Sequence, residues 1–91
     1  VDLSGASLKD LKILKGAENL RILNAENNRI TDITTLKECP HLNTLILAGN
    51  SGLKNAKTLT GLKNLEFVVL DGTGISSKVR TKVERICEGN R

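Results

Sequence analysis

The chain has 91 residues, a formal net charge of +4 and a single aromatic residue, Phe67. A chain of this length forms one domain. Cofactor pockets and base-stacking platforms usually need aromatic faces, so this composition argues against both. Positive and negative residues are mixed along the chain, which makes the net charge only a weak indication of nucleic-acid binding.

The residues that most often carry chemistry form no recognisable motif. Cys39 and Cys87 occupy apolar positions of their local patterns, no Cys-x-x-Cys occurs, and the single histidine, His41, has no neighbouring ligand set. We therefore expect no metal, no cofactor, no catalytic residue and no enzyme activity. We expect reduced, buried thiols and an intracellular protein, located in the cytoplasm or, alternatively, in the nucleus. No signal pattern or long apolar run is present, so we expect no membrane association.

The first part of the chain, residues 1–19, reads as a repeat entered halfway. When the following unit is shifted back by 22 residues, its apolar positions fall on Val1, Leu3, Leu8, Leu11, Leu14 and Ala17. Ala6 stands where the following unit has Asn28. Val1–Ser4 is predicted to be an edge strand, and such edges pair readily. The chain starts without Met, and we expect further repeats before Val1 rather than another chain on this edge. We expect a monomer unless the edge pairs.

The complete unit is Leu20–Pro40. Leu23 and Ala25 alternate along a short strand and are predicted to point inward. Asn28 then turns the chain. A return segment of 3₁₀ or α-helix is predicted next, because apolar residues recur at every third position: Ile30, Ile33, Leu36 and Cys39. Pro40 ends this segment.

The next unit, His41–Gly61, is one residue longer. The insertion falls in Ser51–Gly52, so Leu53 becomes the first apolar residue of the return segment. Lysines in this unit and just after it are predicted to lie on the outside: Lys54, Lys57 and Lys63.

The last strand and turn are predicted in Leu65–Ile75. Val68 and Leu70 are expected to point inward, and Thr73 stands at the position that Asn28 and Asn50 hold in the earlier units. Glycines on both sides of Thr73 predict tight turns.

Residues 76–91 read as a helix. Ser76 or Ser77 is the predicted N-cap, and Gly89–Asn90 is the predicted stop. One apolar stripe follows helical spacing: Val79, Val83, Ile86 and Cys87. We expect this helix to cap the C-terminal end of the stack.

Stacking the units in register groups the outward strand residues into three rows on the concave side. The rows are Ile22, Thr44 and Phe67; then Asp2, Asn24, Ile46 and Val69; then Ser4, Glu26, Ala48 and Asp71. Apolar residues cluster in the first two rows, and acidic residues flank them in the third. We predict a protein-binding surface formed by Ile22, Asn24, Glu26, Thr44, Ile46, Phe67, Val69 and Asp71, with Phe67 as the anchor. The alternative is that sheet propensity alone selected these residues and the chain is a structural spacer.

A second candidate surface is basic. Lys78, Arg80, Lys82 and Arg85 lie on the predicted helix, outside its apolar stripe. They would bind RNA or another anionic surface through phosphate contacts. Glu84 and Glu88 interrupt this set and no aromatic residue interleaves it, so a solvated helix face is the simpler interpretation, and we do not expect nucleic acid to be the partner. Lys9, Lys12 and Lys15 are read as solvent-facing for the same reason.

The pattern Leu-x-x-Leu-x-Leu-x-x-Asn-x-Ile-x-x-Ile-x-x-Leu, clearest in Leu20–Leu36, resembles the short intracellular class of leucine-rich repeats, with units of about 22 residues. Regulatory subunits of protein phosphatase 1, dynein light chain and acidic nuclear phosphoproteins share that class. The resemblance implies an adaptor or regulatory role with a protein partner on a concave face. Ala6 and Thr73 depart from the pattern. Phosphatase binding is not carried over, because the concave surface is not rich in aromatic residues.

We therefore predict an α/β leucine-rich-repeat solenoid, a right-handed superhelix with about four short parallel strands on its concave face. Residues 1–75 would be repeats, the first of them partial, and residues 76–91 a C-terminal capping helix. Together they would form a single domain that lacks an N-terminal cap. The predicted function is non-catalytic binding of a protein partner.

Overall fold

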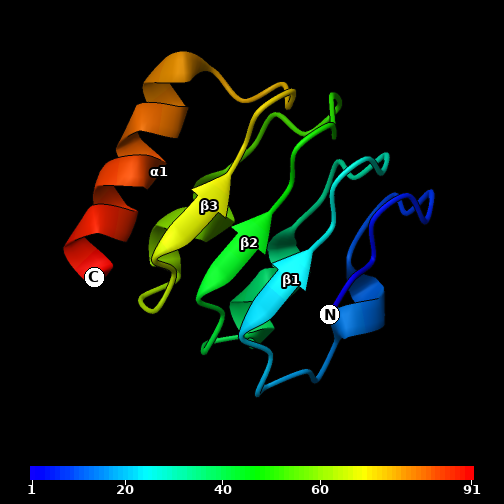
Figure 1. Ribbon diagram of the computed structural model, residues 1–91, viewed down its shortest axis with the longest axis horizontal. Coiled ribbons are helices and arrows are strands. Elements are labelled where there is room, and N and C mark those ends of the chain that lie inside the picture. The colour runs from blue at the N-terminus through cyan, green and yellow to red at the C-terminus, as the bar shows by residue number, and fades with distance from the viewer.

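Short parallel strands and short 3₁₀ helices alternate along the chain and end in one longer helix. The computed structural model describes all of residues 1–91 and measures 32 × 29 × 17 Å. Its elements, in order, are η1 (Lys12–Leu14), β1 (Ile22–Asn24), η2 (Thr34–Glu38), β2 (Thr44–Ile46), η3 (Lys57–Gly61), β3 (Phe67–Val69) and α1 (Ser77–Asn90). The strands form one layer and the 3₁₀ helices lie behind it, with α1 beside β3 and the N-terminus beyond β1 (Figure 1).

The sheet is parallel throughout, with strand order β1-β2-β3. Ile22 pairs with Thr44 and Thr44 with Phe67, so the predicted register is confirmed. Three strands form where about four were predicted: beside β1 the first unit contributes only the parallel bridge between Asp2 and Asn24, and a second bridge joins Asp10 to Asp32 on the return side. No strand lies on the outer side of the Asp2 segment to extend it, and Val1 is 61 % exposed although its repeat position is apolar.

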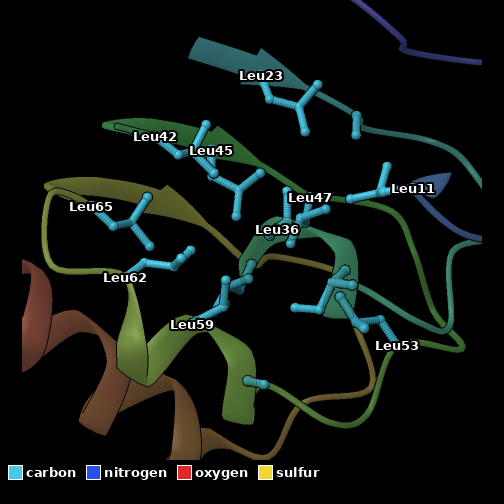
Figure 2. Close-up of a cluster of buried hydrophobic side chains, with 14 of the residues drawn as sticks. Leu11, Leu23, Leu36, Leu42, Leu45, Leu47, Leu53, Leu59, Leu62 and Leu65 are labelled. Carbon is cyan, nitrogen blue, oxygen red and sulfur yellow. The ribbon is translucent and has the colours of Figure 1, made fainter. Parts of the chain in front are cut away.

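The core is one continuous cluster of 20 buried residues between the sheet and the 3₁₀ helices. Leu23, Leu45 and Leu65 extend from the strand side, and Leu36 and Leu59 meet them from the return side (Figure 2). All the predicted inward positions of the unit Leu20–Pro40 are buried, apart from Leu20, which is half-buried at the open end. The three-residue period of the return segments is that of a 3₁₀ helix, so each turn places one apolar side chain on the core.

Two buried asparagines join consecutive turns. The Asn28 side-chain oxygen accepts hydrogen bonds from the backbone N–H groups of Ala6 and Leu8, at 3.0 and 2.9 Å. The Asn50 side-chain oxygen accepts from Ile30 N–H at 3.0 Å, and its amide donates to the carbonyls of Ala25 and Leu47. Each asparagine therefore serves its own turn and the turn before it, which removes the cost of burying those backbone groups.

The inserted residue explains why Thr73 replaces asparagine in the last turn. In the longer loop, Leu53 N–H donates to the carbonyl of Asn50 at 3.0 Å, so this amide needs no acceptor from the following unit. The Thr73 hydroxyl donates to Leu70 O at 2.7 Å, within its own turn. The departure from the repeat pattern at Thr73 thus follows from the insertion at Ser51–Gly52.

A left-handed backbone conformation recurs at one position of the repeat, and in the first unit Ser7 and Gly16 adopt it as well. The φ values of Gly5, Asn27, Gly49 and Gly72 lie between 56° and 81°, and these residues occupy equivalent positions of successive units. A Cβ on Gly49 would overlap the side-chain oxygen of Asn27, so glycine is required there by space as well as by φ. Glycine at these positions lets consecutive turns approach closely: the Asn27 side chain lies against Gly49, and Gly72 lies against the Gly49 backbone.

Helix α1 covers the last repeat. Ser76 is its N-cap, and the Ser76 hydroxyl accepts from Val79 N–H at 3.3 Å. Val83 and Cys87 are buried, while Val79 and Ile86 are half-buried. The helix ends at Asn90, close to the predicted stop, but Gly89 and Asn90 are themselves helical. The Asn90 amide donates to the carbonyls of Leu62 and Leu65, at 3.1 and 2.8 Å, and these bonds tie the last turn to the loop before β3.

Candidate interaction surface on the sheet

The outward residues of the three strands lie in the predicted rows. Ile22, Thr44 and Phe67 are paired neighbours, and so are Asn24, Ile46 and Val69. The third row continues beyond the strands, where Gly5 N–H donates to Glu26 O, Asn27 N–H to Ala48 O and Gly49 N–H to Asp71 O. The three rows predicted from the sequence are therefore present in the structure.

Large apolar side chains are exposed on this face. Phe67 is 53 % exposed, Ile22 57 % and Val69 41 %, whereas Ile46 and Thr44 are half-buried between their neighbours. We name the four apolar residues Ile22, Ile46, Phe67 and Val69 the strand-side patch. Contiguous exposed apolar side chains of this kind are a common feature of interaction surfaces.

The strand-side patch is contiguous. Ile46 and Val69 are paired on adjacent strands, about 5 Å apart, and Phe67 lies two residues before Val69 on β3, about 7 Å away. Ile22 is the diagonal neighbour of Ile46. A partner can therefore contact all four residues at once, with Phe67 and Val69 nearest to α1.

The polar residues predicted for this surface differ in availability. Asp71 is exposed and Glu26 is half-buried, so both can meet a partner at the turn side of the patch. The Asn24 side-chain oxygen accepts a hydrogen bond from Glu26 N–H at 3.1 Å. Asn24 thus holds the turn, and only its amide group remains for a partner.

Arg91 completes the surface at its other side, and the sequence reasoning missed it. Its guanidinium carbon lies 5.0 Å from the centre of the Phe67 ring, and its Nε donates to Glu66 O at 3.0 Å. This cation–π contact fixes the ring and places a positive charge beside it. No local pattern signals the contact, because it depends on α1 continuing through Asn90.

A second missed group lies at the start of the strands. The Asn43 amide donates to the Glu66 carboxylate at 2.9 Å, and the Thr44 hydroxyl donates to the Asn43 side-chain oxygen at 2.9 Å. A spacing of 23 residues between Asn43 and Glu66 matches the repeat and could have indicated the pair. Together with Arg91, these residues make a polar border for the strand-side patch.

The predicted basic set on α1 does not form one face. Lys78, Lys82 and Arg85 are exposed and share a side of the helix at i, i+4 and i+7. Arg80 lies off that side: it is half-buried, and its Nε is enclosed without a hydrogen-bond partner. The exposed basic set therefore has three members instead of four.

The side chains that most often bind metals or act as nucleophiles are either far from one another or buried. No three His, Cys, Asp or Glu side chains gather where they could hold a metal ion. Cys39 and Cys87 are free and buried. Burial raises the pKa of both thiols, and the Glu38 charge adds to the increase at Cys39. No helix has the length and apolar character needed to span a membrane.

A stack of short parallel strands and 3₁₀ returns, with a buried asparagine joining its turns, defines a repeat solenoid. The family described as Leucine Rich repeats (2 copies) matches residues 18–64, which is about half of the chain, and the chain belongs to the leucine-rich-repeat family. No curated protein matches the chain.

Proposed function

We propose that this chain is a non-catalytic protein-interaction module that binds its partner through the strand-side patch. The observation that carries the proposal is the alignment of Ile22, Phe67 and Val69, all strongly exposed, on one rigid sheet face. Leucine-rich-repeat domains commonly mediate protein–protein interaction and are typically non-enzymatic. An apolar centre bordered by Glu26, Asp71 and Arg91 has the composition of a protein interface.

The finer parts of the proposal concern role and location. We propose an adaptor or regulatory role in the cytoplasm or nucleus, in line with the short repeat class that the sequence resembles. Buried, free Cys39 and Cys87 support a reducing compartment. The likeness to phosphatase regulatory subunits remains a prediction.

The test compares two single substitutions that are matched in chemistry. Phe67→Asp introduces a charge into the strand-side patch. Ile13→Asp introduces the same charge at a residue that is 68 % exposed on η1, away from the patch. Affinity capture from lysate, with and without RNase, is quantified for the wild type and both variants. We expect a protein that Phe67→Asp loses, that Ile13→Asp keeps and that RNase does not remove.

The captured protein is then purified and its dissociation constant is measured. A central aromatic anchor contributes about 2 kcal/mol or more, so Phe67→Asp should weaken binding by roughly 30-fold. Equal effects of Phe67→Asp and Ile13→Asp would contradict the proposal. Capture that survives Phe67→Asp but disappears with RNase would instead favour the basic residues Lys78, Lys82 and Arg85. No capture by any form would favour a structural spacer.

A further inference from the structure

A groove lies on the return side of the molecule, opposite the strand-side patch. It has a volume of about 870 Å³ and runs between η2 and η3. Pockets that bind ligands have volumes of roughly 300–1,000 Å³, so this groove is large enough for a ligand. We name it the return-side groove. The exposed strand residues lie on the other face of the sheet, so the two surfaces do not overlap.

The lining of the return-side groove is strongly biased in charge. Three lysines contribute to it, Lys37, Lys57 and Lys63, against the single carboxylate of Asp32. That carboxylate is already engaged, because one of its oxygens accepts from both the backbone N–H and the hydroxyl of Thr34. The lining therefore presents a net positive charge to anything that enters.

The polar groups around the groove bond to one another and leave the ammonium groups free. The Thr60 hydroxyl donates to Lys57 O at 2.7 Å, and the Asn64 amide donates to Pro40 O at 2.8 Å. These bonds hold η3 and the loop before β3 in place without using any lysine side chain. Lys37 and Lys57 are exposed on η2 and η3, which the core fixes through Leu36 and Leu59, and Lys63 is exposed in the loop after η3.

The groove also offers apolar contact. Ile33 and Leu62 belong to its lining but are almost fully buried, so its accessible apolar surface comes mainly from the aliphatic parts of the lysines, the threonines and Pro40. No aromatic residue is present to stack a base, since the only one, Phe67, lies on the opposite face. A peptide with carboxylates and short apolar side chains would match both the positive charge and the apolar surface of the groove. A nucleotide base would find no aromatic side chain to stack on.

We propose that the return-side groove is a binding site for an acidic peptide segment, whose carboxylates pair with Lys37, Lys57 and Lys63. The site is independent of the strand-side patch. One chain can then hold two protein segments at once, one on each face.

The test measures fluorescence anisotropy of a labelled peptide, Glu-Glu-Leu-Glu-Glu-Leu-Glu-Glu, titrated with the full chain. The groove variant is Lys37→Gln, Lys57→Gln and Lys63→Gln. The control variant, Lys78→Gln, Lys82→Gln and Arg85→Gln, loses the same charge from α1. Loss of three exposed ion pairs predicts roughly tenfold weaker binding for the groove variant and about twofold or less for the control. Circular dichroism checks that both variants are folded.

Three outcomes would overturn the proposal. The first is no binding by the wild type, and the second is equal weakening in the groove and control variants, which would indicate general charge attraction. The third is tighter, groove-dependent binding of an RNA oligonucleotide of equal charge or of inorganic phosphate, which would identify another class of ligand. Phe67→Asp should leave the peptide affinity unchanged, so the result is independent of the function proposed for the strand-side patch.

Discussion

At the residue scale, Asn50 makes three hydrogen bonds although it is fully buried. Its side chain joins Ile30 N–H, Ala25 O and Leu47 O, all backbone groups that water does not reach. A buried polar group without a partner costs about 1–3 kcal/mol. Asn50 therefore contributes mainly by preventing such losses in two adjacent turns.

The first prediction concerns Asn50 and its counterpart in the next turn, Thr73. Asn50→Ala leaves Ile30 N–H and Leu47 O unpaired, because Ala25 O keeps its bond from Asn28. We expect a loss of about 3 kcal/mol in the free energy of unfolding. Thr73→Ala removes the donation to Leu70 O and the long hydrogen bond from Ile75 N–H, both within a single turn, and Leu70 O still accepts from Thr73 N–H, so this change should cost about 1 kcal/mol. Urea denaturation of both variants measures the difference, and equal losses would contradict the role assigned to Asn50.

The sequence analysis missed another recurring position, which lies just before each 3₁₀ helix. Asp10, Asp32 and Asn55 stand at equivalent points before η1, η2 and η3, and each side-chain oxygen accepts the backbone N–H two residues later. The repeat spacing could have indicated this position, which supplies an acceptor at the start of each return. Hydrogen bonds from the backbone and the hydroxyl of Thr34 lower the pKa of Asp32 below its usual value.

The second prediction follows from that lowered pKa. Asp32 contributes stability above its unfolded pKa, about 3.9, and this contribution is lost as pH falls through the lower pKa of the folded state. Asp32→Asn keeps the acceptor, as Asn55 shows at the equivalent position, but it cannot titrate. We expect similar urea midpoints for the two proteins at neutral pH and a smaller loss for the variant below about pH 4. Identical acid profiles would contradict the prediction.

At the scale of elements, α1 is fastened at both ends by side-chain hydrogen bonds. Ser76 caps its start, and Asn90 bonds to two carbonyls of the loop that leads into β3. The sequence predicted the helix and its apolar stripe. It placed the stop at Gly89–Asn90, because glycine and asparagine commonly end helices and the anchoring carbonyls come from Leu62 and Leu65, far away in the sequence.

The third prediction tests this end of α1 with two adjacent substitutions. Gly89 is helical with a negative φ, and a Cβ there would meet no atom within 4 Å. Gly89→Ala should therefore raise the free energy of unfolding by about 0.5–1 kcal/mol. Asn90→Ala removes two hydrogen bonds and should lower it by about 1–2 kcal/mol. If Gly89→Ala instead lowers the free energy of unfolding, Gly89 acts as a helix stop and the prediction is wrong.

At the scale of the whole molecule, the sequence predicted what depends on the repeat period. Inward positions such as Leu23, Leu36 and Leu59 and the rows of the sheet follow from period and register alone. The features that were missed depend on the ends of the stack or on side chains from different units. Arg91 reaches Phe67 only because α1 folds back along β3, and the return-side groove combines lysines from successive units.

The fourth prediction concerns how the stack opens. Cys39 follows η2, which has a neighbouring unit on each side, whereas Cys87 is on α1, which packs on one side only. Burial raises the pKa of both thiols and encloses them, so each reacts only when its surroundings open.

Reaction with a disulfide reagent should therefore be slower by on the order of a hundredfold or more in the native protein than in urea. Cys87 should react before Cys39, and single Cys→Ala variants identify which thiol is labelled. Equal native rates would indicate that the chain opens only as a whole.

The left-handed residues at equivalent positions of the units have a consequence for which amino-acid enantiomer fits there. Gly5, Asn27, Gly49 and Gly72 adopt torsion angles that are natural for D-amino acids. The same position of every repeat thus has mirror-image geometry and is occupied by achiral glycine or by asparagine, which tolerates it. In a chemically synthesised chain, D-alanine at an exposed member such as Gly5 would favour the turn that L-alanine opposes, because it removes freedom only from the unfolded chain.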